Sequence, residues 1–173
     1  MIGFPGRDEA VEYFWTYISK TGDGDIRDIL DAQVPSTIAL LNGISEAQSL
    51  HRYAAGKWSI REVLGHVNDA ERVFAFRAWW FARGFATPLP AFDQDIAVAA
   101  ANSDERSWAS HIAEFQAVRA ATSSFFRGLG AEAWSARGIA SDNPVTVRAL
   151  AYIIAGHLTH HVRILEASYL KPA

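Results

Sequence analysis

Residues 150–165 read LAYIIAGHLTHHVRIL, and this stretch decides the fold because its apolar residues recur at three- and four-residue steps. That period predicts an α-helix with one apolar stripe facing a core. His157 and His161 are four residues apart, so both lie on the stripe, one turn from each other. An imidazole in an apolar core is costly unless its nitrogens find partners, and a metal ion is one such partner.

His66 is a third candidate ligand, far earlier in the chain. It stands between Val63 and Val67, beside the apolar face of another expected helix. Three imidazoles suit Zn²⁺, Ni²⁺, Cu²⁺ or Fe²⁺. Three protein ligands leave a position open for water or a substrate, which is typical of a catalytic metal site. The residues therefore predict one divalent ion held by His66, His157 and His161, with imidazole nitrogens roughly 2.0–2.2 Å from it.

Glycines directly precede two of these histidines, as Gly65-His66 and Gly156-His157. A glycine inside a helix costs roughly 1 kcal/mol relative to alanine, and close approach of a second backbone or a ligand is one reason to accept that cost. The alternative is that the glycines only relieve helix crowding and the histidines hydrogen-bond to carbonyl groups. The sequence leaves both interpretations open.

Other polar residues near the candidate ligands are expected in other roles. His160 lies about 100° round the helix from its neighbour, so we expect it to face another helix or solvent. Asp69 follows His66 by three residues, and it either orients an imidazole or stays on the solvated helix surface. His51 and His111 belong to no motif and are expected at the surface or partly buried.

The composition bounds the class of protein. The 173 residues predict one domain, 1–173, and 50% of them are hydrophobic, as in an ordinary globular protein. The net charge of −3 comes without a Lys/Arg cluster, so we expect no nucleic-acid partner. There is no cysteine, so His, Asp, Glu or water must hold any metal. Without an apolar run of about 18 residues or a signal-peptide pattern, we expect no membrane partner and a cytoplasmic location.

The helical period runs through the whole chain. It predicts helices over residues 8–20, 25–44, 59–84, 103–128 and 146–169. Ser59 and Glu62 have the spacing of a capping box, and Thr146 is an expected N-cap. Residues 85–102 are expected as a long connection, which fits a bundle with two parallel neighbouring helices. No segment alternates at period two. The sequence thus predicts an all-α fold, a four-helix bundle with a long crossover connection and a short extra N-terminal helix.

Aromatic residues near the end of the 59–84 helix cover more than one face. Trp79 and Trp80 point about 100° apart, so both indoles cannot enter one core groove. With Phe85 they predict an apolar patch that a homodimer buries, and packing against the long connection is the alternative. Three arginines are expected along a solvated edge of the same helix: Arg72, Arg77 and Arg83. Nothing in the sequence supports a role for them in gripping an anionic substrate.

The chain resembles the DinB-like (DinB/YfiT) superfamily from Asp25 to Tyr169. The segments that carry the resemblance are KWSIREVLGH (57–66), ERVF (71–74), FDQD (92–95), VRAL (147–150) and GHLTHH (156–161). The resemblance implies a four-helix bundle with a long crossover. It also implies a divalent metal held by one histidine of the second helix and two of the last, and these positions fall on His66, His157 and His161.

The resemblance further implies a metal-dependent enzyme that acts with a low-molecular-weight thiol such as bacillithiol, mycothiol or glutathione. The metal, expected to be zinc, nickel or iron, would bind the thiol, whose thiolate attacks an electrophilic small-molecule substrate. The absence of cysteine fits, since the nucleophile then comes from outside the chain. A non-catalytic metal-binding stress protein and a metal-dependent hydrolase stay open as alternatives. Leu158 departs from the family pattern, in which glutamate often follows the first histidine of the motif.

Overall fold

The structure is a computed structural model, and it describes residues 1–170. Four long helices and two short ones make up most of it: α1 (Glu12–Ile18), α2 (Ile26–Asn42), α3 (Ile60–Ala82), α4 (Gln94–Ala100), α5 (Trp108–Arg127) and α6 (Val147–Ile164). A hairpin of β1 (Arg137–Ala140) and β2 (Asn143–Thr146) precedes α6. Single 3₁₀ turns span Arg7–Glu9, Gln48–Leu50, Ser103–Glu105 and Ala131–Ser135, and a π-helical turn, Leu165–Tyr169, follows α6.

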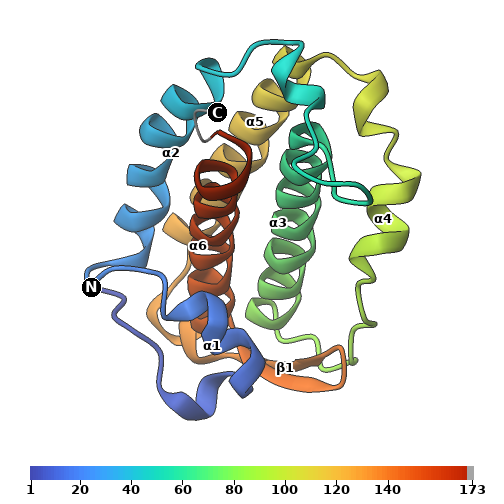
Figure 1. Ribbon diagram of the computed structural model, residues 1–173. Coiled ribbons are helices and arrows are strands. Elements are labelled where there is room, and N and C mark those ends of the chain that lie inside the picture. Colours follow the sequence, from blue (N-terminus) through green and yellow to red (C-terminus); the bar gives the residue numbers. More distant parts are fainter. Residues whose placement is uncertain (171–173) are drawn as a thin grey trace.

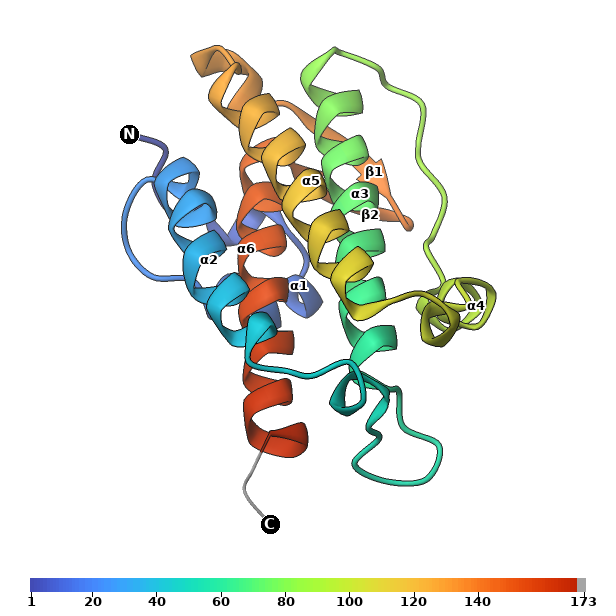
Figure 2. The same ribbon diagram turned by 90° about the horizontal axis from the view of Figure 1, so that it is seen from above.

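The four long helices form a bundle with α3 and α6 side by side at its centre (Figure 1). Helices α2 and α5 complete the bundle, and α1 packs against α6 (Figure 2). Helices α3 and α5 are neighbours that run in the same direction, because the chain returns along the outside of the molecule through α4 before α5 begins (Figure 1). The predicted all-α four-helix bundle with a long crossover and a parallel helix pair is confirmed.

Side chains cap the helices where the sequence predicts. The Ser59 hydroxyl accepts from the Glu62 backbone N–H at 3.1 Å, and the Glu62 carboxylate accepts from the Ser59 N–H at 2.7 Å. The Thr146 hydroxyl accepts from the Ala149 N–H at 3.1 Å. These bonds satisfy backbone donors that a helix leaves unpaired in its first turn. They fix the start of α3 and α6, the helices that carry the histidines.

The crossover contains a helix that the sequence analysis did not predict. Asp93 caps α4 by accepting from the N–H groups of Asp95 and Ile96 at 2.9 and 3.1 Å. The helix is only seven residues long, and of these only Val98 is buried. A segment with one buried residue shows no apolar period, so the sequence does not reveal this helix. The long connection expected over residues 85–102 is present, and α4 lies within it.

The β-hairpin is a second difference. Its strands are four residues each, and its two-residue loop places Ser141 and Asp142 at φ values of +52° and +61°. A turn with both central residues in the left-handed region matches the twist of the flanking strands, and Asn-Gly is its usual sequence. Ser-Asp lacks that signal, and strands this short cannot show an alternating pattern.

Two predicted helix starts lie too early in the chain. Helix α5 begins at Trp108 with Ser107 as its cap, because residues 103–105 form a separate 3₁₀ turn. Helix α1 begins at Glu12, and Asp8 belongs to the 3₁₀ turn before it. In each case a 3₁₀ turn stands just before the helix, where the sequence predicts its first turn.

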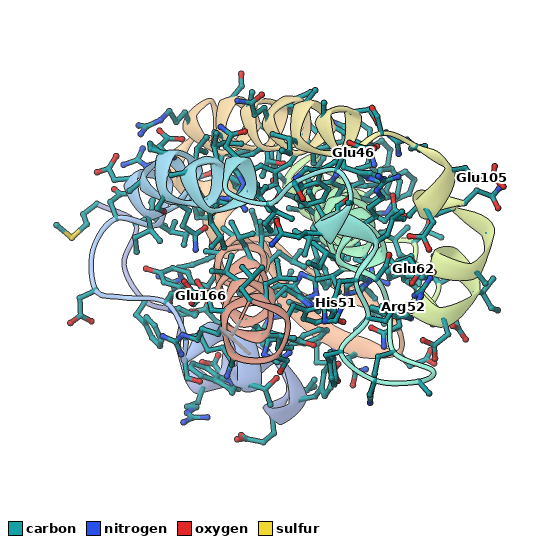
Figure 3. The ribbon with its side chains drawn as sticks, turned by 45° about the horizontal axis from the view of Figure 1, so that its top comes forward. Glu46, His51, Arg52, Glu62, Glu105 and Glu166 are labelled. Atoms are coloured by element: carbon teal, nitrogen blue, oxygen red, sulfur yellow. The ribbon has the colours of Figure 1, made fainter. Side chains whose placement is uncertain are left out.

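Ionic contacts tie the loop before α3 to the crossover. The Arg52 guanidinium donates to the carboxylates of Glu62 and Asp104, and Asp104 also accepts from the Ser59 hydroxyl at 2.5 Å. Arg52 and Glu62 lie at the end of the bundle where α3 begins (Figure 3). These contacts hold the crossover against the first turn of α3.

The apolar core forms two clusters along the bundle axis. One joins α1 and the hairpin to the second half of α3 and the first half of α6, and the other joins the opposite halves of α3 and α6. Helices α2 and α5 contribute buried residues to both clusters. On α3 the change from one cluster to the other falls between Val67 and Ala70, and on α6 between Ala155 and Leu158. The candidate histidines lie at this boundary. None of the helices in residues 1–170 has the length and apolar character needed to cross a bilayer.

Candidate metal centre

The three predicted ligands converge. The Nε2 atom of His157 lies 3.1 Å from Nε2 of His66 and 3.1 Å from Nε2 of His161. Each ring offers a nitrogen, and these nitrogens all lie within 4.8 Å of one another. The three residues are 4%, 5% and 9% exposed for His66, His157 and His161. Helix α3 thus presents His66, and its antiparallel neighbour α6 presents His157 and His161, to the same point in the core.

The spacing of the ring nitrogens, rather than their hydrogen bonding, fits a bound cation. The Nδ1 atoms of His66 and His161 are buried and have no hydrogen-bond partner among residues 1–170. None of the three rings donates to a carbonyl group in that part of the chain, so the carbonyl alternative is not found. Nitrogens that ligate one zinc ion at about 2.1 Å stand roughly 3–3.5 Å apart. The two Nε2 distances from His157 lie in this range, and the third pair lies within 4.8 Å.

Burial keeps the rings neutral. Loss of solvation lowers the pKa of His66 to about 4 and of His161 to about 3, and it lowers the pKa of His157 well below the ordinary value. The neighbouring imidazoles add to the effect, because a second positive charge beside the first is unfavourable. A neutral imidazole has a lone pair for a metal, so the environment favours the ligand form.

Aromatic side chains hold the rings in place. The Trp58 ring packs on His66 with centroids 5.1 Å apart, and the Tyr17 ring meets His157 edge-on at 5.2 Å. Tyr17 can come this close because of Gly156: a Cβ there would lie 2.0 Å from the Tyr17 carbonyl oxygen. Of the two interpretations that the sequence leaves open for these glycines, close approach of a second backbone is the one found at Gly156.

A cavity of about 350 Å³ adjoins the cluster, lined by both His66 and His157. Its walls come from α1, α3, the crossover and the hairpin, and its apolar side includes Phe14, Phe74 and Phe92. No aspartate or glutamate is among the described residues that line it. A second cavity of about 290 Å³ reaches His161 and shares no lining residue with the first. The cluster is therefore open to ligands from two cavities.

Two sequence expectations about buried residues were wrong. Arg77 is 4% exposed and lines the larger cavity, whereas the sequence predicted a solvated edge. His111 is fully buried, with Nε2 2.9 Å from the Ser103 carbonyl oxygen. The backbone carbonyl of Pro90 accepts a hydrogen bond from Arg77, and that of Ser103 lies within hydrogen-bond distance of His111. Both carbonyls belong to the crossover, whose path the helical period does not predict.

The other neighbouring residues agree with their expected places. His160 is half-buried, lies outside the cluster and packs against Tyr17 at 5.5 Å. Asp69 pairs with Arg72 at 3.1 Å, so it is a helix-surface carboxylate and orients no imidazole. His51 is exposed.

The chain belongs to the DinB superfamily, whose family model matches residues 29–165. This range contains all four bundle helices except the first turn of α2, together with His66, His157 and His161. It leaves out α1. No curated protein sequence matches the chain.

Solved structures share the fold. YfiT from Bacillus subtilis, described as a probable metal-dependent hydrolase with an unusual four-helix bundle topology, is 18% identical, covers 83% of each chain and has a TM-score of 0.69. A mycothiol-dependent maleylpyruvate isomerase is 13% identical with a TM-score of 0.67. Its match covers 86% of this chain and 60% of the isomerase, so the chain spans less than two thirds of that enzyme.

Proposed function

We propose that this protein is a metal-dependent transferase in which His66, His157 and His161 hold one divalent cation, and in which a low-molecular-weight thiol is activated to attack an electrophilic small molecule. The observation that carries the proposal is that three buried, neutral imidazoles converge at the wall of a ligand-sized cavity. A purely structural site is closed by protein ligands, whereas three protein ligands beside a cavity leave a position for a reactant.

The residues of the chain supply the position and the environment. When bound, a divalent cation would lower the pKa of a coordinated thiol toward neutrality. Trp58 and Tyr17 fix the ring planes of two ligands through their packing. Phe14 and Phe74 give the cavity an apolar wall, which excludes water and so strengthens electrostatic interactions inside it. A thiolate formed in such a place reacts with the electrophile before solvent does.

The composition of the cavity favours a thiol over water as the nucleophile. Water bound to a metal keeps a pKa of about 7, so metal-dependent hydrolysis often adds a general base, usually a carboxylate or a free histidine. Leu158 follows His157 where related sequences often have glutamate, and no carboxylate lines the larger cavity. A thiol loses its proton when it binds a cation, so it needs no such base. The proposed reaction also requires a reduced small thiol, which the cytoplasm supplies, and we place the protein there.

A metal-dependent hydrolase is the second candidate, because YfiT has the same fold and is described as a probable hydrolase. A metal-binding stress protein without turnover is the third. All three require the same metal site, so metal binding alone does not separate them.

The deciding experiment measures metal content and turnover on the same preparation. The purified protein is analysed for zinc, nickel and iron, treated with a chelator and reloaded. Each form is then assayed with an electrophile in the presence and absence of glutathione, mycothiol or bacillithiol. We expect turnover only with both metal and thiol, at a rate that rises with pH and then levels off. Turnover of an ester without thiol would favour the hydrolase. No turnover, with chelation lowering only the melting temperature, would favour the stress protein.

A further inference from the structure

Arg77 is a buried cation without a counter-charge. It is 4% exposed, and no carboxylate oxygen of residues 1–170 lies within 4.0 Å of its guanidinium. The two other buried arginines each have one: Arg61 pairs with Glu46, and Arg119 pairs with Glu71. Taking a charge out of water costs several kcal/mol unless a partner compensates it. The fold therefore places a positive charge in the cavity wall and provides nothing negative for it.

The hydrogen bonds of Arg77 leave most of its donors free. Nη2 donates to the Pro90 carbonyl oxygen and to the Ser141 hydroxyl, both at 2.9 Å. Nε and Nη1 make no hydrogen bond with residues 1–170, and neither atom is among the fully buried ones. A guanidinium has five N–H donors in a planar fork that matches a carboxylate. Since both neutral acceptors are bonded to Nη2, the N–H groups of Nε and Nη1 are left to donate to an anion.

The rest of the cavity indicates what the anion is attached to. Phe14 and Phe74 form an apolar wall, and the Phe74 ring centroid lies 5.8 Å from Cζ of Arg77. His66 and His157 line the same cavity. A molecule held at Arg77 by an anionic group thus has its apolar part among aromatic rings and beside the histidine cluster.

We propose that Arg77 binds the carboxylate of the electrophilic substrate, and that the substrate is a small unsaturated or aromatic carboxylic acid. That the substrate is an electrophile rests on the proposed function, whereas the carboxylate site rests on the residues that line the cavity. Arg77 then determines specificity: it selects acids over uncharged analogues and orients the reactive carbon toward the metal centre.

A purely structural role for Arg77 is the competing explanation, because its two hydrogen bonds fasten the crossover to the hairpin. A neutral donor would make those bonds without burying a charge. Burial also lowers the pKa of Arg77, with no nearby acid to oppose the effect. Arg77 borders another cavity of about 330 Å³ under Leu89 and Pro90, and the other cation there, Arg72, is already paired with Asp69 and Glu114.

The test measures binding of cinnamate and of cinnamamide by calorimetry, with the protein as purified and after chelation. Both probes are flat and aromatic, and only cinnamate is charged. We expect cinnamate to bind at least about tenfold tighter than cinnamamide in both forms, since tenfold is only about 1.4 kcal/mol and a hydrogen bond to a charged group in a buried site contributes at least as much. Equal binding of acid and amide would overturn the proposal. Acid binding that disappears on chelation would also overturn it, because the carboxylate would then be on the metal.

A pair of variants at Ser141 isolates the charge. Ser141→Asp places a carboxylate where the hydroxyl now accepts from Arg77, so it should compete with the ligand and weaken cinnamate binding by about tenfold or more. Ser141→Asn has nearly the same shape without the charge and should stay within about threefold of wild type. Both residues tolerate the positive φ of this turn. Equal affinities in the two variants would contradict the proposal.

Two more variants complete the test. Arg77→Lys keeps the charge and loses the fork, and it should bind cinnamate more weakly than wild type and more tightly than Ser141→Asp. Arg72→Gln should leave binding unchanged, and a loss there would place the anion in the other cavity and overturn the proposal. Thermal unfolding of every variant reports on folding. If cinnamate binding depends on its charge but the protein binds no metal and shows no thiol-dependent turnover, the carboxylate site stands and the proposed function is refuted. If turnover requires thiol but does not depend on the charge of the substrate, the proposed function stands and the carboxylate site is refuted.

Discussion

Two buried polar clusters lie in the same bundle, and they differ in whether the protein completes them. Arg119 and Glu71 are 1% and 3% exposed, and Arg119 donates from Nε and Nη2 to the Glu71 carboxylate. Its Nη1 donates to the Leu30 carbonyl oxygen at 3.1 Å and to Gln33 at 2.9 Å. The histidine cluster has Nε2 atoms that face one another and Nδ1 atoms without partners. In the first cluster the protein supplies the counter-charge for its own cation, whereas in the second the converging Nε2 atoms leave their lone pairs for a cation from outside.

The largest expected effect is on the complete cluster. Glu71→Ala leaves Arg119 buried and unpaired, so we expect it to lower the free energy of unfolding by about 3–5 kcal/mol. Urea titration measures this loss. Asp31→Ala, which removes one carboxylate from the exposed pair with Arg127, is the matched control and should cost less than about 1 kcal/mol. Folded Glu71→Ala should still bind one equivalent of metal, and loss of metal would show that the two clusters are not independent.

The incomplete cluster should respond in the opposite way. His157→Ala removes the central candidate ligand, and we expect metal affinity to fall by more than about 100-fold, with a larger drop in melting temperature in the metal-loaded protein than in the metal-free one. The metal-free variant also loses the packing of a buried ring, so it is the reference from which the metal contribution is measured. His160→Ala is the control and should keep full metal stoichiometry. Equal metal loss in both variants would mean that the wrong rings have been identified.

Acid should destabilise the metal-free protein through the same rings. The pKa values of His66 and His161 are lowered to about 4 and 3 in the fold, against 6.5 for a free imidazole. Between these values the unfolded chain binds more protons than the folded one, so stability falls as the pH drops from about 6.5 to about 4. Urea titrations at pH 7.5 and 5.0 measure the loss. His161→Gln should show a smaller difference between the two pH values, and an unchanged difference would contradict the argument.

The smallest expected effect on stability concerns an exposed apolar surface that the protein leaves uncovered by its own residues. Phe76, Trp79 and Phe85 are exposed on and after α3, and the Trp80 and Phe85 rings stack at 4.2 Å. We predict that a homodimer buries this patch, since a monomer rarely exposes so many adjoining aromatic rings. Trp79→Glu should give a 19.0 kDa species in sedimentation at micromolar concentration, with the free energy of unfolding of the monomer within about 0.5 kcal/mol. Wild type sedimenting as a monomer would refute the dimer.

The sequence predicts the parts of this molecule that a local period encodes. The stripe that carries His157 and His161 follows from a 3.6-residue repeat, and the Ser59 cap follows from a short motif. His66 joins them because a bundle has few ways to pack its apolar faces. Arg77 could not be placed in the same way, because its burial depends on Pro90 and Ser141, which are distant in sequence and belong to segments without a period.

The contact between Gly156 and Tyr17 ties the shape of the cavity to a single backbone position. A Cβ at Gly156 would lie 2.0 Å from the Tyr17 carbonyl oxygen, so a larger residue there would push α1 away from α6. Helix α1 contributes Phe14 and Tyr17 to the cavity wall and none of the three clustered histidines. The shape of the chamber can therefore change through α1 while the histidine cluster stays in place.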